Sequence, residues 1–136
     1  MSWLDLIDRA EALRAVFGRM VPQLDAVRLH EVTLHQDGPT IFFRFDLSEF
    51  PETPPPKWQK AAHNTVQVRL ALDDVLETTV LGWTRNNVGR LSIEPYLPAG
   101  LKVEFVTSEV KVLVVSKFVR VDRIDAYRDS SRTSQS

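Results

Sequence analysis

Apolar and polar residues alternate along much of the chain, and this alternation predicts β-strands. In the segment 41–47, Ile41, Phe43 and Phe45 are separated by residues expected on the opposite face. Because strand side chains point to opposite faces with a period of two, the segment reads as a half-buried strand. The segment 66–72 has the same pattern. The side chains expected to face the core are Phe43, Phe45, Val68, Leu70, Val112 and Val114.

The segment 27–35 is also predicted to be a strand, but its apolar residues change phase. Val27 and Leu29 share one face, whereas the next two apolar residues share the other. Either a β-bulge near His30 and Glu31 resets the phase, or the strand is covered on both faces. We favour the bulge.

Turn signals divide the remaining sequence into further short strands. Asp37-Gly38 accepts the positive φ values of a hairpin turn, and Asp73-Asp74 reads as a second turn. The expected strands are 27–35, 41–47, 66–72, 75–83, 91–93, 101–105, 110–115 and 118–127. The fold is therefore predicted to be mainly β, an antiparallel β-sandwich or strongly curved sheet of about eight strands. No second long helical pattern supplies a parallel crossover.

One helical segment precedes the strands. Apolar residues recur at three- and four-residue spacing from Trp3 to Met20, which predicts an amphipathic helix or a broken pair of helices. Capping-box patterns begin at Ser2 and again at Asp8, so we place a break near Asp8. Gly18 is expected to end the element.

Composition limits the class of protein without specifying an activity. The 136 residues fit one domain, expected over residues 1–128 with a disordered polar tail over 129–136. The net charge of −1 argues against a general nucleic-acid-binding protein, and cysteine is absent, which excludes disulfides and thiolate chemistry. The N-terminus is acidic rather than signal-like, and no apolar run reaches the ~20 residues that span a bilayer. We expect a cytoplasmic location.

Charge is unevenly distributed along the chain. Residues 37–77 hold seven acidic and four basic residues, whereas residues 82–136 hold six acidic and nine basic residues. This is either an ordinary solvated surface or an acidic face that steers a basic partner. The acidic part includes the proline-rich segment 50–58, which is a rigid connector or an exposed recognition loop carrying Trp58.

The sequence contains no recognisable catalytic constellation. His30 and His35 lack the spacing of a metal site, and no nucleophile-elbow or phosphate-binding glycine loop is present. A hydrolase site around His35 and Asp37 remains one alternative. The tryptophans are interpreted as core-edge residues, although Trp58 or Trp83 could line a ligand pocket.

Several short motifs together resemble one protein family. Leu24-Asp25-x-Val27-x-Leu29-x-x-Val32-x-Leu34-His35-x-Asp37-Gly38-Pro39 is the longest, and the others are Phe43-x-Phe45-Asp46-Leu47, Pro55-x-Lys57-Trp58, Asn64-Thr65-Val66-Gln67-Val68, Gly82-Trp83, Glu11-Ala12-Leu13 and Tyr127-Arg128-Asp129. In this order and spacing they resemble the bacterial immunity-protein family numbered fifty, from Trp3 to about Asp129.

This resemblance implies a non-enzymatic protein that neutralises a cognate polymorphic toxin in bacterial competition. It implies no catalytic residue, and from the composition and motifs we expect no cofactor, metal, nucleic acid or membrane partner. The alternative is a small-molecule-binding β domain with a pocket near Trp58 or Trp83. From loop position, tryptophan chemistry and charge, the candidate partner-binding residues are Glu49, Glu52, Lys57, Trp58, Asp73 and Asp74.

Overall fold

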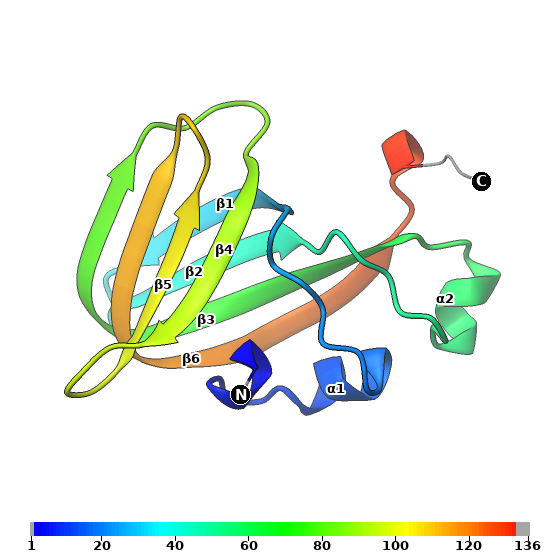
Figure 1. Ribbon diagram of the computed structural model, residues 1–136, viewed down its shortest axis with the longest axis horizontal. Coiled ribbons are helices and arrows are strands. Elements are labelled where there is room, and N and C mark those ends of the chain that lie inside the picture. Colours follow the sequence, from blue (N-terminus) through cyan, green and yellow to red (C-terminus); the bar gives the residue numbers. More distant parts are fainter. Residues whose placement is uncertain (1, 133–136) are drawn as a thin grey trace.

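The computed structural model describes residues 2–132, and its centre is one antiparallel β-sheet that closes into a barrel (Figure 1). The strands are β1 (Val27–His35), β2 (Thr40–Asp46), β3 (Thr65–Leu81), β4 (Val88–Pro95), β5 (Leu101–Val106) and β6 (Lys111–Tyr127). Their order in the sheet is β1-β2-β3-β6-β5-β4, and β1 pairs with β4 to complete the barrel. The mainly β, antiparallel prediction is confirmed. The sandwich alternative is wrong, because one sheet curves until its first and last strands meet.

Six strands replace the eight that were predicted, because two predicted breaks lie within long strands. β3 and β6 each contain 17 residues and pair with each other over most of their length. The predicted turn at Asp73-Asp74 is instead a local distortion of β3, in which Asp74 has a φ of +56° and a bulge follows Val75. Val75 pairs with Ser116 in β6, where the second break was expected.

The alternation of side chains places the core inside the barrel as predicted. All six residues expected to face inward are fully buried. The bulge in β1 is also confirmed, since its register with β2 shifts between Leu29 and Glu31. This shift lets Val27 and Leu29 share the inner face with Val32, whose partner Phe43 is buried.

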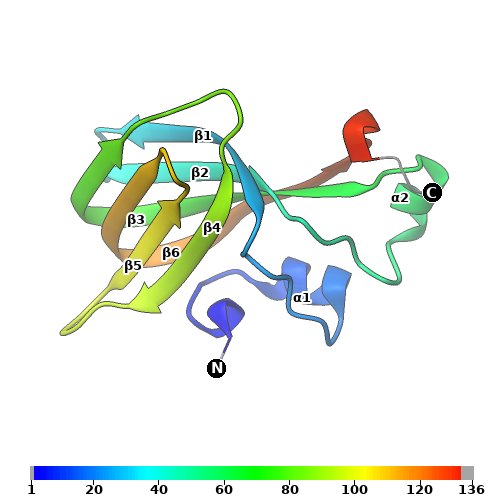
Figure 2. The ribbon, with the colours of Figure 1, turned by 45° about the horizontal axis from the view of Figure 1, so that its top comes forward.

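The N-terminal segment is a broken pair of short helices, η1 (Trp3–Asp5) and α1 (Glu11–Phe17). The break falls at Asp8, whose N–H donates to the Val119 carbonyl (2.8 Å) and so ties the segment to β6. Gly18 ends α1 as predicted, but the capping box predicted at Asp8 is wrong because Ala10 precedes the helix without a side-chain cap. The view in Figure 2 shows α1 lying outside the sheet.

Two further helical turns lie outside the barrel. α2 (Pro56–Lys60) occupies the proline-rich region that was predicted to be an extended loop. Proline is compatible with the first helical turn, because its missing N–H would have no partner there. η2 (Ser130–Arg132) follows β6. The rest of the predicted disordered tail, 133–136, lies outside the described residues, so the domain boundary at 128 stays a prediction.

Candidate functional site

The six predicted partner-binding residues form two groups at opposite ends of β2. Glu49, Glu52, Lys57 and Trp58 lie after its last residue, in the segment that leads to and includes α2. Asp73 and Asp74 lie in β3, where Asp73 pairs with the first residue of β2. A strand of this length separates them by roughly 20 Å. The structure therefore does not bring the six residues together on one patch.

Some of these side chains already have partners within the fold. The Trp58 side chain is half-buried and packs against Phe50, with 6.1 Å between ring centroids. A Glu49 carboxylate oxygen accepts a backbone N–H from the segment before β1 (2.7 Å). Asp73 forms an ion pair with Arg120 (2.8 Å). Glu52, Lys57 and Asp74 have no such bond in the part of the chain that the structure describes.

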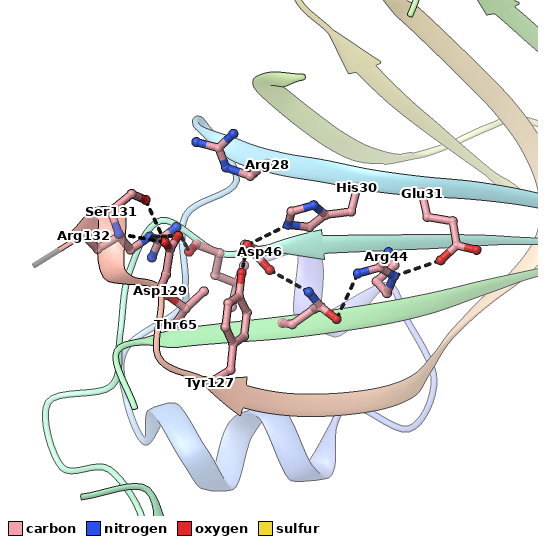
Figure 3. A network of polar contacts seen from close by, with 12 residues as sticks. Arg28, His30, Glu31, Arg44, Asp46, Thr65, Tyr127, Asp129, Ser131 and Arg132 are labelled. Atoms are coloured by element: carbon pink, nitrogen blue, oxygen red, sulfur yellow. Dashed lines mark hydrogen bonds and ion pairs between the residues drawn. The ribbon is translucent and has the colours of Figure 1, made fainter. Parts of the chain in front are cut away.

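A polar network on the outer face joins four neighbouring strands through the carboxylate of Asp46 in β2 (Figure 3). Asp46 is fully buried although its side chain points away from the barrel core. One of its oxygens lies 2.8 Å from His30 Nε2 and accepts the Tyr127 hydroxyl. The other accepts the Gln67 side-chain amide at 2.9 Å. A buried carboxylate needs such donors, so the network fixes β1, β2, β3 and β6 relative to one another.

The same network explains the environment of Tyr127. Burial raises the pKa of this phenol, and its hydrogen bond to the Asp46 carboxylate raises it further. A histidine paired with an aspartate is part of many acid–base sites, but there the imidazole also contacts a nucleophile. Here the hydroxyl bonded to Asp46 is that of Tyr127, and among residues 2–132 no hydroxyl is bonded to His30. The arrangement is that of a structural bond between strands.

A shallow cleft of about 390 Å³ lies beside this network on the outer face. Three arginines line it, and each pairs with a carboxylate: Arg44 with Glu31 at 2.8 Å, Arg69 with Asp122 at 3.0 Å, and Arg123 with Asp125 at 2.9 Å. The hydrogen bond from Arg44 holds the pKa of Glu31 below its usual value. Because the positive charges are neutralised locally, this cleft has no surplus charge with which to attract an anion.

A second feature is a gap in the side of the barrel, which we name the lateral opening. Within residues 2–132, β1 pairs with β4 only at Val27 and Arg28, and no described strand lies beside the edge of β1 from His30 to His35. The other border is the segment 76–87, the end of β3 and the loop that follows. Figures 1 and 2 show this loop arching over β1 to reach β4.

Apolar side chains are exposed around the lateral opening. Leu34 is 60% exposed, Trp83 46% and Val80 45%, and Leu76 is exposed on the same segment of β3. Leu34, Val80 and Trp83, together with Val32, line a hollow of about 300 Å³. Single exposed apolar residues are ordinary, but neighbouring ones that include a tryptophan are typical of protein interaction sites.

Carboxylates without ion pairs lie at one end of the lateral opening. Asp37 is in the turn between β1 and β2, and the Val75 N–H donates to the Pro39 carbonyl of the same turn (3.1 Å). Asp74 therefore lies beside this turn, and Glu77 is close along β3. Residues 2–132 provide no salt bridge to any of these three acids.

Other kinds of site find little support among the described residues. No group of three or more His, Cys, Asp or Glu is arranged to hold a metal ion there. At the alternative site, the His35 ring packs edge-on against Phe42 at 5.2 Å, and among residues 2–132 no hydrogen bond joins it to Asp37. Within residues 2–132 no helix has the length and apolar character needed to cross a membrane.

Sequence reasoning did not identify the lateral opening. Asp74 was selected as a partner-binding residue and Trp83 was named as a possible lining of a ligand pocket, but Leu34 and Val80 were interpreted as ordinary strand residues. Alternation cannot distinguish an inward-facing residue that a neighbouring strand covers from one beside a gap in the sheet. Both kinds of residue recur with a period of two. The sequence offers one signal of exposure, since polar residues such as Glu77 and Thr78 lie between Leu76 and Val80.

Comparison with known proteins gives a match to a protein family. Residues 9–127 match the family described as Immunity protein 50. Neither the curated proteins nor the solved structures contain a match to this chain. The matched region includes all six strands, the polar network and both borders of the lateral opening. The chain therefore belongs to the immunity protein 50 family.

Proposed function

We propose that this protein is a non-enzymatic immunity protein, which binds one cognate bacterial toxin in the cytoplasm and blocks it. Membership of the immunity protein 50 family supports the class of function. The observation that carries the mode of action is the exposed apolar rim of the lateral opening, which includes Trp83. A protein that acts by binding alone needs such a surface, since desolvated aromatic side chains contribute much of the energy of protein association.

The proposed surface includes only part of the acidic region identified from the sequence. Asp74 lies beside the lateral opening, whereas Glu49, Glu52 and the half-buried Trp58 lie at the other end of β2. We place toxin binding at the opening because Trp83 is exposed there, while Trp58 packs against the core.

Coexpression tests this function directly. The product of the adjacent gene is expressed alone, with the wild-type protein, and with Trp83→Ala or Tyr96→Ala. Tyr96 is an exposed aromatic residue in the loop between β4 and β5, so Y96A is a matched control. We expect the wild-type protein and Y96A to restore growth and W83A to lose most of this protection. If the wild-type protein binds the adjacent product neither in cells nor after purification, the proposed function is contradicted for this pair.

A second candidate function follows from the hollow at Trp83, which could hold a small apolar molecule. Its lining is mainly apolar, as in many ligand sites, but it lies at the surface rather than inside the barrel. An environment-sensitive apolar dye distinguishes the two functions. Binding of one dye per protein at low micromolar concentration, lost in W83A, would favour the small-molecule function if the adjacent gene product did not compete with the dye.

A further inference from the structure

We infer that the toxin places an extended segment in the lateral opening, where it adds a strand to the free edge of β1. This segment is apolar on its inward side and basic at the end nearest the turn between β1 and β2. The inference rests on the proposed function and specifies how that function is performed. Backbone pairing, side-chain pattern and charge lead to it separately.

The backbone of β1 has unpaired groups at this edge. Hydrogen-bonded and non-hydrogen-bonded pairs alternate along antiparallel strands. The Leu47 N–H donates to the Val66 carbonyl (2.9 Å). Every second residue of β2, counted backwards from Leu47, therefore forms its backbone hydrogen bonds with β3. Those between them, including Phe42 and Arg44, bond to β1, where their partners are Thr33 and Glu31.

This alternation directs the N–H and C=O groups of Val32 and Leu34 to the other edge of β1. No strand among residues 2–132 pairs with that edge beyond Arg28. Water satisfies such groups, but so does the backbone of an added strand, which is a recurrent mode of peptide recognition. An extended polypeptide is the occupant whose hydrogen-bonding groups repeat at the spacing of these residues.

The side chains around the opening match one face of an added strand. Val32 and Leu34 pair with the inward residues Phe43 and Ile41, so their own side chains lie on the inner face. Val80 and Trp83 approach the hollow from the opposite border. A strand placed between these borders would direct every second side chain into the hollow, and apolar residues at those positions would extend the barrel core.

Charge specifies the ends of the added segment. Asp37, Asp74 and Glu77 lie at the end near the turn and have no ion pairs in the described chain. Arg28 and Arg85 lie towards the other end, where Arg28 bonds to the Asn86 side chain. A partner segment with Lys or Arg near the turn would therefore meet opposite charge, whereas the reverse orientation would meet like charge.

Substitutions at Val32 separate backbone pairing from side-chain contact. Val32→Pro removes the N–H at the free edge without removing a bond to β2, because that N–H faces the opening. Val32→Thr keeps the N–H and the branched shape. With the purified product of the adjacent gene as probe, we expect V32P to weaken binding by at least about tenfold, and V32T by about threefold or less.

A second pair of variants tests the position of the surface. Leu34→Lys places a charge at the free edge, a change that natural proteins use to prevent strand addition. Leu97→Lys makes the same change at an exposed leucine between β4 and β5. We expect L34K to weaken binding by more than about tenfold and L97K to leave it unchanged. Urea unfolding of each variant shows whether the fold is retained.

Amide hydrogen exchange provides a direct readout of the added strand. The Val32 and Leu34 amides should exchange rapidly in the free protein and become protected by at least about tenfold in the complex. A complex that forms with these amides unprotected, or with V32P and L34K binding as wild type, would overturn strand addition while leaving toxin neutralisation intact. Protection that appears in the absence of the toxin, together with a dimer in sedimentation equilibrium, would assign the edge to a second copy of this chain instead.

Discussion

At the residue scale, the position of each aromatic side chain in β2 determines its role. Phe43 and Phe45 are fully buried in the barrel, whereas Phe42 lies on the outer face. The Arg69 guanidinium lies 3.9 Å from the centre of the Phe42 ring. Phe43 and Phe45 therefore stabilise the fold by core packing, whereas Phe42 stabilises it by a contact with a charged group.

Substitution to alanine should separate these two roles. Phe43→Ala removes a large buried side chain and leaves a cavity, so it should lower the free energy of unfolding by about 3–5 kcal/mol. Phe42→Ala makes the same chemical change at a partly exposed position and should cost about 1 kcal/mol. Urea unfolding at neutral pH measures both. A loss below about 1 kcal/mol for F43A would contradict its place in the core.

The Tyr127 phenol should make stability depend on pH under alkaline conditions. Because burial and the bond to Asp46 raise its folded-state pKa, the folded protein retains this proton above about pH 10, where the unfolded chain loses it. Its stabilising contribution is therefore complete below about pH 10 and is lost as the pH rises through the folded-state pKa. The free energy of unfolding should fall more steeply above pH 10 in the wild type than in Tyr127→Phe.

Tyr96→Phe serves as the control for this titration, since Tyr96 is exposed and outside the polar network. Equal slopes for the wild type and Y127F between about pH 10 and 12 would mean that the hydrogen bond to Asp46 does not couple to folding.

At the element scale, the sequence predicted where strands occur better than where they end. Alternation correctly located all the strand segments and the β1 bulge, because each is a local property of spacing. The merging of 66–72 with 75–83, and of 110–115 with 118–127, depends on pairing between β3 and β6. Each strand supports the other across its distorted region, and no local pattern contains that information. The position of α2 was missed because prolines were interpreted as excluding regular structure.

The candidate site was less predictable than the fold for a related reason. Exposure of Leu34 and Val80 depends on where β4 stops pairing with β1, a contact between residues far apart in the sequence. The charged candidates were selected from loop position and charge, and Glu49, Glu52 and Lys57 lie at the end of β2 that is far from the lateral opening.

The loop that borders the opening depends on a glycine at its start. Gly82 follows β3 with a φ of +74°, and a Cβ there would lie 2.1 Å from the Glu109 carbonyl oxygen. Gly82→Ala must therefore displace backbone as well as adopt an unfavourable conformation. Gly18 has a φ of +66° but open space around it, so Gly18→Ala isolates the conformational cost of roughly 1–3 kcal/mol. Thermal and urea unfolding should show a larger loss for G82A, and equal losses would contradict the close approach.

At the scale of the whole molecule, five acidic residues from the segment 37–77 lie in two separate regions. Asp37, Asp74 and Glu77 surround one end of the lateral opening, while Glu49 and Glu52 lie beyond the far end of β2. Charges that face a partner speed its association, and salt screens this effect over about 8–10 Å. Neutralising one region or the other should therefore change the rate of association with the toxin to different extents.

Neutralising each region separately tests which one faces the toxin. Asp37→Asn, Asp74→Asn and Glu77→Gln together should reduce the association rate constant by about fivefold or more at low salt and weaken its dependence on ionic strength. Glu49→Gln with Glu52→Gln should leave both unchanged. Stopped-flow or surface-binding kinetics over a range of salt concentrations measures the two variants. The opposite result would move the binding surface to the segment that contains Trp58.

The barrel core and the rim of the lateral opening are built from different residues, which affects how the protein can diverge. Leu34, Val80 and Trp83 are exposed, and substitutions at exposed positions usually change stability by less than about 0.5 kcal/mol. Recognition can therefore change in small steps while the folded state is retained. Two strains that share this barrel could lose protection against each other's toxin through a few substitutions at the rim, without any change in the interior.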